Sequence, residues 1–217
     1  ALLLLAWVRL AVPDFPGQAR HQRLPVRLVF LIPGVRPVLL VLFAWILAHN
    51  ILYTYVAPFL GATGTDLRLD LILLVFGVAS VVGIWGTGLL VDRQLRALTL
   101  ISLAAFAVAA ILLAIPHHSA VLVLIGVAAW GLTFGGAPTL LQTALADSAG
   151  DHADVAQSIL VTVFNLAVAG GGLIGGLVTD QAGPGWLPWI LLPLVMTALA
   201  TVWQAKAHGF RAGRRAA

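Results

Sequence analysis

The sequence predicts an all-α polytopic membrane protein, and two observations support this prediction. Of the 217 residues, 61% are hydrophobic and only 9% are charged, whereas a soluble domain is about 45–50% apolar and about 25% charged. Every charged residue also falls outside six long apolar runs, which cover residues 38–60, 71–91, 97–115, 120–146, 155–179 and 186–205. This composition argues against a soluble enzyme and excludes a disordered chain, and the absence of Cys excludes a disulfide-stapled secreted domain.

Each apolar run has the length that a membrane-spanning helix requires, which is about 20 residues. The alternative is a β-barrel, whose strands are about 9–11 residues long and alternate in polarity. The run from Leu71 to Phe76 is apolar throughout and does not alternate. We therefore expect six transmembrane helices. Pro58 and Pro138 should kink the first and the fourth of them, because proline cannot donate the helical hydrogen bond.

The basic residues predict how these helices are oriented. If six helices cross in succession, only Arg68 lies on one side, and eleven basic residues lie on the other: Arg9, Arg20, Arg23, Arg27, Arg36, Arg93, Arg96, Lys206, Arg211, Arg214 and Arg215. The basic side, which holds the C-terminus, should be cytoplasmic. One loop on that side, residues 147–154, carries three Asp and no basic residue, but it does not reverse the balance. The net charge of +4 therefore reflects topology, and a nucleic-acid partner is not indicated.

The segments around the six runs predict the domain organisation. Residues 1–8 are apolar but too short to span, and we interpret them as the tail of a truncated transmembrane helix. Residues 9–37 are basic and proline-rich, which is typical of a cytoplasmic linker, and part of this linker (residues 20–32) could form a short amphipathic helix on the membrane surface. Residues 38–206 would form the six-helix bundle and residues 207–217 a basic cytoplasmic tail. The chain then represents the C-terminal half of a larger transporter, and its missing partner is an N-terminal half of six helices.

Two stretches of sequence resemble a known transporter family. The segment Gly88-Leu-Leu-Val-Asp-Arg-Gln-Leu-Arg96 resembles the G-x-L-x-D-R-x-x-R loop of the major facilitator superfamily, in its second-half copy. Residues 49–60 (HNILYTYVAPFL) and residues 156–176 are similar to the seventh and eleventh helices of bacterial twelve-helix drug/proton antiporters of the sugar-efflux type. The resemblance covers residues 1–206.

The resemblance implies a fold and an activity. Members of this family have two six-helix bundles that move about a substrate site near the middle of the membrane. The resemblance implies a secondary active transporter of the bacterial cytoplasmic (inner) membrane. This transporter would export neutral sugars or hydrophobic drug-like compounds by alternating access, with the proton as its coupling ion. Its partners would be a small-molecule substrate and the lipid bilayer.

Depth arithmetic identifies candidate residues for a substrate cavity. With a rise of about 1.5 Å per residue, a position about ten residues into a span lies near the bilayer centre, where polar groups are costly unless they face a cavity or a partner. Helical spacing adds neighbours on the same faces, and the candidates are Trp45, His49, Asn50, Tyr53, Trp130, Phe134, Ser158, Thr162 and Asn165. Aromatic and neutral polar groups suit a neutral polyol or an amphipathic drug. The alternatives are that His49 joins helices by a hydrogen bond and that the aromatic residues only pack.

Two further groups of residues have predicted roles in movement and packing. The loop residues Gly88, Asp92, Arg93 and Arg96 would act as a latch for one access state, and the alternative is that they only set topology. The glycines Gly131, Gly135, Gly171, Gly172, Gly175 and Gly176 form G-x-x-x-G patterns, which let helix backbones approach closely. This pattern is compatible both with static packing of the helices and with sliding of one helix bundle on the other.

The sequence contains no common catalytic motif, so we expect no enzyme and no cofactor. We expect no metal site either, because the adjacent His117 and His118 lack further ligands nearby. One alternative function is a six-helix structural or scaffold protein that oligomerises without transport, and the glycine faces would serve it equally well. Another is an intramembrane enzyme, for which His49 is the one available catalytic group. His49 could also relay a proton, although we favour a coupling acid in the N-terminal half.

Overall fold

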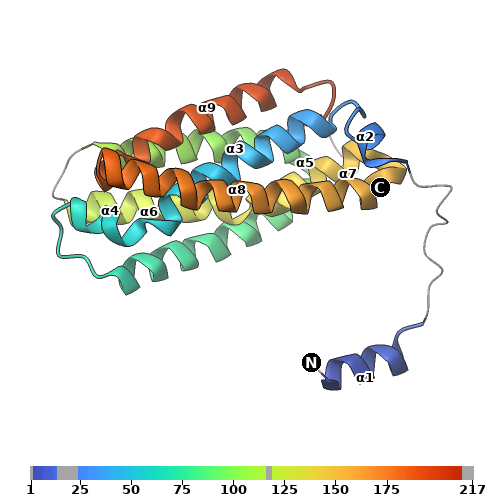
Figure 1. Cartoon of the computed structure of the whole chain (residues 1–217), viewed down its shortest axis with the longest axis horizontal. Coiled ribbons are helices and arrows are strands. Elements are labelled where there is room, and N and C mark those ends of the chain that lie inside the picture. The colour runs from blue at the N-terminus through green and yellow to red at the C-terminus, as the bar shows by residue number, and fades with distance from the viewer. Residues whose placement is uncertain (1, 14–23, 116–118, 212–217) are drawn as a thin grey trace.

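The computed structural model describes residues 2–13, 24–115 and 119–211. These residues form helices and the turns between them, with no strand in the described ranges. The helices pack side by side into one elongated bundle, and α1 (Leu2–Ala11) lies apart from it (Figure 1). The all-α prediction is confirmed for these ranges. Helix α1 ends at Ala11, three residues beyond the predicted boundary at Val8. The linker residues 14–23, His117, His118 and the tail residues 212–217 lie outside the described residues.

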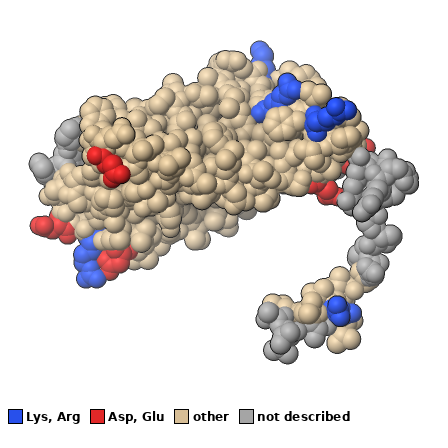
Figure 2. All heavy atoms as spheres, in the orientation of Figure 1, with Lys and Arg blue, Asp and Glu red and all other residues tan. Residues whose placement is uncertain are grey.

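The bundle has the length and surface of a membrane protein. Four helical stretches of the described chain are long and apolar enough to cross a bilayer: Val35–Thr54, Leu69–Ala114, Ala120–Gln181 and Pro184–Gln204. On the face shown in Figure 2, charged side chains gather at the two ends of the bundle and leave the middle uncharged. An uncharged middle matches the hydrocarbon layer, and charged ends match the headgroup regions.

The first long helix of the bundle is broken near its end. It forms α3 (Val35–Thr54) and α4 (Val56–Ala62), and Tyr55 between them has φ −112° and ψ 24°. Pro58 has no N–H to donate to the carbonyl of Thr54, four residues earlier, so the helical ladder is interrupted at this point. The kink predicted from Pro58 is confirmed.

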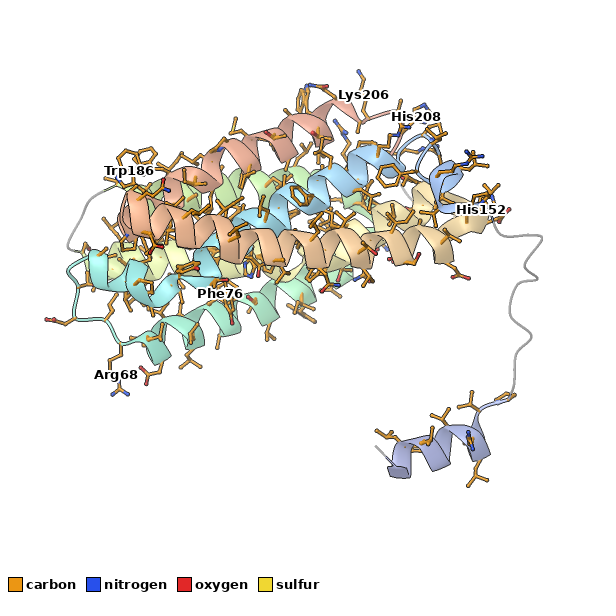
Figure 3. All side chains as sticks on the ribbon, in the orientation of Figure 1. Arg68, Phe76, His152, Trp186, Lys206 and His208 are labelled. Atoms are coloured by element: carbon orange, nitrogen blue, oxygen red, sulfur yellow. The ribbon has the colours of Figure 1, made fainter. Side chains whose placement is uncertain are left out.

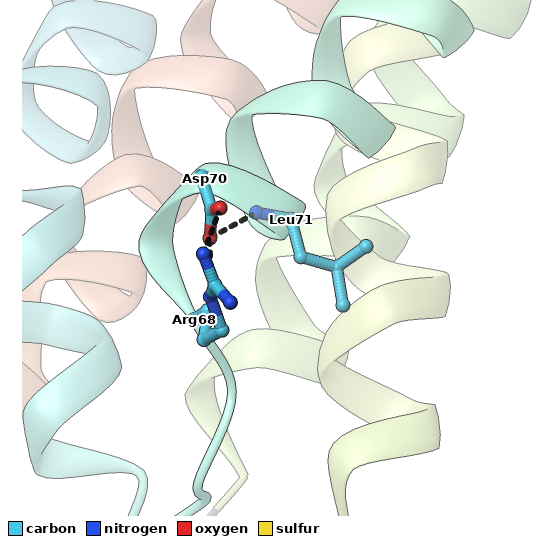
Figure 4. A network of polar contacts seen from close by, with 3 residues as sticks. All are labelled: Arg68, Asp70 and Leu71. Carbon is cyan, nitrogen blue, oxygen red and sulfur yellow. Dashed lines mark hydrogen bonds and ion pairs between the residues drawn. The ribbon is translucent and has the colours of Figure 1, made fainter.

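The next helix, α5 (Leu69–Ala114), contains 46 residues and begins at a compact polar turn. Asp70 accepts hydrogen bonds from the Arg68 guanidinium at 2.6 and 3.1 Å and from the backbone N–H of Leu71 at 3.0 Å (Figure 4). A carboxylate in the first turn of a helix is favoured by the positive end of the helix dipole. Both charged side chains are largely exposed, so the ion pair itself contributes little to stability.

Helix α5 is a hairpin that turns at Gln94, whose φ of −138° and ψ of 30° are not helical. A Cβ atom added at Gly131 would collide with Phe76 in the first half of α5, and one added at Gly126 would lie 2.8 Å from Leu113 in the second half. Two α5 residues that are far apart in sequence thus contact nearby turns of α6 (Ala120–Gly135), so the halves of α5 lie side by side. The predicted loop of residues 92–96 is in fact helical apart from Gln94, because one residue suffices to reverse the chain.

The following helices are divided by a second proline. Gly136 separates α6 from α7 (Ala137–Ala149), and Pro138 has no N–H to donate to the carbonyl of Phe134. The N–H of Gly136 bonds to that carbonyl instead, so the predicted kink at Pro138 is confirmed. The chain continues through a short turn, η2 (Gly150–His152), into α8 (Ala153–Gln181), and through η3 (Pro184–Trp186) into α9 (Leu187–Gln204).

Helix α3 forms the centre of the bundle and packs against α7, α8 and α9, while α5 packs against α6, α7 and α9. Most side chains of α3 are buried, among them Trp45, Ile46 and Leu52. A short helix, α2 (Val26–Val29), precedes α3. Arg68 and Trp186 lie at one end of the bundle, and His152, Lys206 and His208 lie at the other (Figure 3). Helices α8 and α9 therefore run the length of the bundle in opposite directions.

Candidate functional site

Five aromatic rings from three helices meet near the centre of the bundle. We call them the aromatic cluster: His49 and Tyr53 of α3, Phe76 of α5, and Trp130 and Phe134 of α6. The rings of His49 and Phe134 are stacked, with centroids 3.4 Å apart and planes inclined by 2°. His49 also stacks on Tyr53 at 5.1 Å, and Phe76 approaches Trp130 at 4.6 Å with tilted planes. The separations of 5.1 and 4.6 Å lie in the range at which aromatic rings attract one another, whereas the His49–Phe134 pair is a closer, face-to-face contact.

A hydrogen bond joins α6 to α3 inside the cluster. The indole N–H of Trp130 donates to Nδ1 of His49 at 3.2 Å, and both side chains are buried. This bond requires the lone pair on Nδ1 to be free of a proton. A buried polar side chain without a partner is costly, so the pair stabilises the contact between the two helices. The structure therefore contains the interhelical hydrogen bond that was considered for His49 as an alternative, and its partner is Trp130.

The cluster is closed on one side and open on the other. Trp130 is 1% exposed and His49 7%, whereas Tyr53 is 43% exposed. Phe76 and Phe134 are half-buried. The open side exposes part of Tyr53, and to a smaller extent Phe76 and Phe134, to whatever adjoins the bundle. Such a surface can stack a planar ring or an apolar group and offers one hydrogen-bonding hydroxyl.

Phe76 was not among the candidates predicted from the sequence, although its position within the second apolar run could have identified it. Tyr53 lies fifteen residues after the start of the first apolar run at position 38, and Phe76 lies fifteen residues before the end of the second run at position 91. Consecutive membrane helices run in opposite directions, so these two positions share one depth. The rings of Tyr53 and Phe76 have centroids 5.6 Å apart.

Two other candidates on α3, Asn50 and Trp45, are not part of the ring contacts of the cluster. The side-chain amide of Asn50 donates to the carbonyl of Ile46 on its own helix at 2.8 Å. A Cβ atom added at Gly171 would lie 2.5 Å from the Cβ of Asn50, so Asn50 faces α8. Trp45 is fully buried in the core, and its indole N–H has no partner among the described residues.

The three polar candidates on α8 form an exposed stripe. Ser158, Thr162 and Asn165 each donate to a carbonyl of α8 itself, three or four residues earlier, at 2.7 to 3.1 Å. All three side chains are exposed on the surface of the bundle. The structure therefore brings together the candidates on α3 and α6 but leaves those on α8 on a separate, outward surface.

The predicted latch residues have different surroundings. Gly88, Asp92 and Arg93 are exposed, while Arg96 is half-buried. The Arg96 guanidinium donates to the carbonyls of Val202 at 2.5 Å, Trp203 at 2.9 Å and Phe210 at 3.1 Å. The carbonyls at a helix C-terminus lack helical donors and carry partial negative charge. Arg96 thus caps α9 and ties the turn that follows it to α5.

The predicted packing glycines also differ from one another. Cβ atoms added at Gly131 and Gly135 would collide with the backbone of α5, and those added at Gly171, Gly175 and Gly176 would meet Asn50 or Tyr55 of the α3–α4 segment. A Cβ atom added at Gly172 would meet nothing within 4 Å. The carbonyl of Gly172 instead accepts a hydrogen bond of 2.8 Å from the Tyr55 hydroxyl.

Comparison with known proteins identifies the family. The family model of the Major Facilitator Superfamily matches residues 1–169 and 71–213. The chain is 32% identical over 186 residues to the purine ribonucleoside efflux pump NepI of Escherichia coli (strain K12) and to the same-named pump of Shigella flexneri. The match covers 84% of this chain and 46% of each relative, so the chain spans about half the length of these curated relatives. The hydrophobic helical bundle, the sequence of the Gly88–Arg96 segment and these matches lead to one conclusion: the chain belongs to the major facilitator superfamily.

Proposed function

We propose that the chain forms the C-terminal six-helix half of a twelve-helix transporter. The six crossings would be the α3–α4 segment, the first and second halves of α5, the α6–α7 segment, α8 and α9. At about 1.5 Å per residue, the 46 residues of α5 are long enough to cross a hydrocarbon core of about 30 Å twice. The match to 46% of the efflux-pump relatives supports the assignment of one half.

The orientation follows from the charges at the two ends. Lys206 and His208 lie at the end opposite Arg68 (Figure 3), and the basic residues predicted to be cytoplasmic outnumber those on the other side by eleven to one. We propose that the end with Lys206 faces the cytoplasm of a bacterium, in line with the excess of positive charge on inner loops.

The substrate we propose is a neutral small molecule with a planar ring, and a purine ribonucleoside is the first candidate. The observation that carries this proposal is the aromatic cluster, which is open at Tyr53 and can stack a heterocycle. The membrane-spanning runs contain no charged residue to pair with an ionic substrate. The relatives that are 32% identical are named as purine ribonucleoside efflux pumps. Neutral sugars lack a planar aromatic ring, and hydrophobic drugs remain the second class.

The stripe of Ser158, Thr162 and Asn165 would line the opposite side of the same cavity. Its side chains are exposed in the bundle and lie at a depth where lipid contact would be costly. We propose that the stripe faces the N-terminal half across the transport path, where it would bind hydroxyl groups of the substrate. Movement of the two halves would then bring the aromatic cluster and the stripe into contact with one substrate in turn.

The coupling ion we propose is the proton. The six apolar runs contain a single imidazole side chain, that of His49. Its Nδ1 accepts the hydrogen bond from Trp130, so protonation of Nδ1 would break that bond. This makes the pair a structural element that changes with protonation, and we assign proton transfer itself to acidic groups of the N-terminal half.

The test is uptake into inverted membrane vesicles by the polypeptide encoded in the full reading frame that contains residues 1–217. We expect accumulation of a radiolabelled purine ribonucleoside that depends on a proton gradient and falls at least about tenfold in Tyr53→Ala, because the ring at the mouth of the cluster is lost. The matched control is Trp203→Ala, which removes an exposed aromatic ring far from the cluster.

Three results of this experiment would contradict the proposal. Equal uptake by the two variants would remove the aromatic cluster from the substrate path. Uptake of a neutral sugar in place of the nucleoside would overturn the substrate class. Transport that persists after the proton gradient has been collapsed would overturn the coupling ion.

A further inference from the structure

A cavity lies at the end of the bundle that carries Lys206 and His208. It has a volume of about 660 Å³ and is located between the start of α3 and the end of α9. One wall is apolar and is formed by Phe30, Pro33, Pro37 and Leu40, and the polar lining residues include Arg36, Gln204 and His208. We call this cavity the α3–α9 pocket. It lies apart from the aromatic cluster, because Leu40 precedes His49 by more than two helical turns.

The wall that carries His208 is held in place by close contacts. Gly34 has φ +99°, and a Cβ atom added there would lie 2.6 Å from the backbone nitrogen of Gly209. Phe210 is fully buried, and its carbonyl accepts a hydrogen bond from Arg96 at 3.1 Å. The turn after α9 is therefore packed onto the bundle. The pocket between this turn and α3 is a defined feature of the fold.

The polar rim of the pocket is basic. Its lining residues include Arg36 and His208 and contain no Asp or Glu. The Nε of Arg36 donates to the carbonyl of Phe30 at 3.0 Å, which uses one of the five N–H donors of the guanidinium. Lys206 lies at the same end, where Lys and Arg side chains gather in Figure 2. The electrostatic potential of this rim favours an anion, and a guanidinium is well suited to a phosphate group.

The surroundings of the pocket match the boundary between lipid headgroups and acyl chains. Trp203, next to Gln204 in the chain, is 69% exposed, and exposed Trp near a helix end is typical of that boundary. Leu40 is 46% exposed, and the apolar side chains of Val26 and Leu31 are 57% and 56% exposed. An apolar wall that continues to the surface can take an acyl chain, while the basic rim takes the headgroup.

We propose that the α3–α9 pocket binds one anionic phospholipid. The phosphodiester lies at the rim between Arg36 and His208, and an acyl chain runs along Pro37 and Leu40. Basic pockets between transmembrane helices near the cytoplasmic surface are known to bind acidic lipid headgroups. The lipid would hold the linker side of α3 against the end of α9.

The test is native mass spectrometry of the detergent-purified polypeptide with added phosphatidylglycerol or phosphatidylcholine of identical acyl chains. We expect phosphatidylglycerol to bind more tightly, and the preference to fall about fivefold when Arg36→Gln and His208→Gln are combined, because an Arg side chain near the surface contributes about 1 kcal/mol. Arg68→Gln, at the opposite end of the bundle, removes a charge of the same sign and should leave the preference unchanged. Equal binding of the two lipids, or a preference that survives the double variant, would overturn the proposal.

Two further measurements separate a lipid from other occupants. Leu40→Trp places a larger side chain in the apolar wall of the pocket without a change of charge, so it should weaken phosphatidylglycerol binding. This variant provides an independent test if the double variant fails to fold. Glycerol 3-phosphate at millimolar concentration should not displace the lipid, and full displacement would show a site for soluble anions instead. If removal of residues 212–217 strongly increases lipid binding, the tail of the chain is the natural occupant and the proposal fails. All these readouts measure binding, so they are independent of the proposed efflux.

Discussion

Two glycine-rich contacts join helices of this bundle, and they differ in what faces the glycines. On α6, Cβ atoms added at Gly131 and Gly135 would collide with the backbone carbonyls of Phe76 and Ser80 on α5. On α8, a Cβ atom added at Gly175 would lie 2.6 Å from the ring of Tyr55, and one added at Gly176 would lie 2.7 Å from its hydroxyl. The first contact joins two main chains. In the second, the nearest atoms belong to a side chain, and the main-chain oxygen of Ile51 is farther away, at 3.1 Å from the Cβ atom added at Gly175.

The difference indicates where the bundle is rigid and where it can adjust. A helix backbone cannot yield at one residue without disturbing its hydrogen-bond ladder, and the Ser80 hydroxyl also donates to the carbonyl of Gly131 at 3.1 Å. A tyrosine ring, in contrast, can change rotamer. We infer that α5 and α6 move as one unit, and that the contact between α8 and the break at Tyr55 can change in the proposed transport cycle. The G-x-x-x-G pattern alone does not distinguish these two cases.

The largest expected effect is from Gly135→Ala at the main-chain contact. The new methyl group has no space beside Ser80, and overpacking of this kind costs about 1–3 kcal/mol. We expect the melting temperature in detergent, followed by intrinsic fluorescence, to fall by about 4–8 °C for a cost of about 2 kcal/mol. The matched control is Gly77→Ala on α5, where the added Cβ meets nothing within 4 Å. If both variants melt at the same temperature, the rigid contact does not exist.

A smaller effect is expected at the side-chain contact. Gly176→Ala should displace the Tyr55 hydroxyl and break its hydrogen bond to the carbonyl of Gly172, at a cost of about 1 kcal/mol. Tyr55→Phe removes the same bond without adding a methyl group. A variant that combines Gly176→Ala with Tyr55→Phe should therefore be no less stable than Tyr55→Phe alone, so the stability losses of the two single variants should not add. Full additivity in chemical denaturation would show that Gly176 contacts something other than the hydroxyl.

The smallest effect is expected from Gly172→Ala, in the middle of the same glycine cluster. An added Cβ has open space there, and alanine favours a helix over glycine by about 0.5–1 kcal/mol. The melting temperature should stay the same or rise slightly. A clear fall in the melting temperature would mean that this face of α8 is covered in the assembled protein, and would identify a third glycine contact beside the two compared here.

Most of the fold could be predicted from the sequence, because the membrane restricts what an apolar run can become. The proline breaks at Tyr55 and Gly136 were also predictable, since each follows from a missing N–H. The turn at Gln94 was not. Nothing in the local sequence distinguishes a five-residue loop from a single non-helical residue, and the contacts of both halves of α5 with α6 decide the matter.

The candidate site was predictable only in part. The spacing of His49 and Tyr53 placed them on one face of α3, and Trp130 and Phe134 on one face of α6, as the aromatic cluster shows. Which faces meet depends on how the helices rotate about their axes, and periodicity does not report that rotation. The carbonyls that Arg96 binds lie 106 to 114 residues away in the chain, so no local pattern could point to them.

The central position of α3 has a consequence for the synthesis of the protein. The ribosome completes α3 at Thr54, but the helices that cover it include α8, which begins at Ala153, and α9, which begins at Leu187. Throughout that interval the side chains of His49, Asn50 and Trp45 face lipid, the insertion machinery or transient neighbours instead of the helices that cover them in the finished bundle. The bundle can close only when its last two helices arrive, so translation that stalls before Ala153 leaves the core of the protein on its surface.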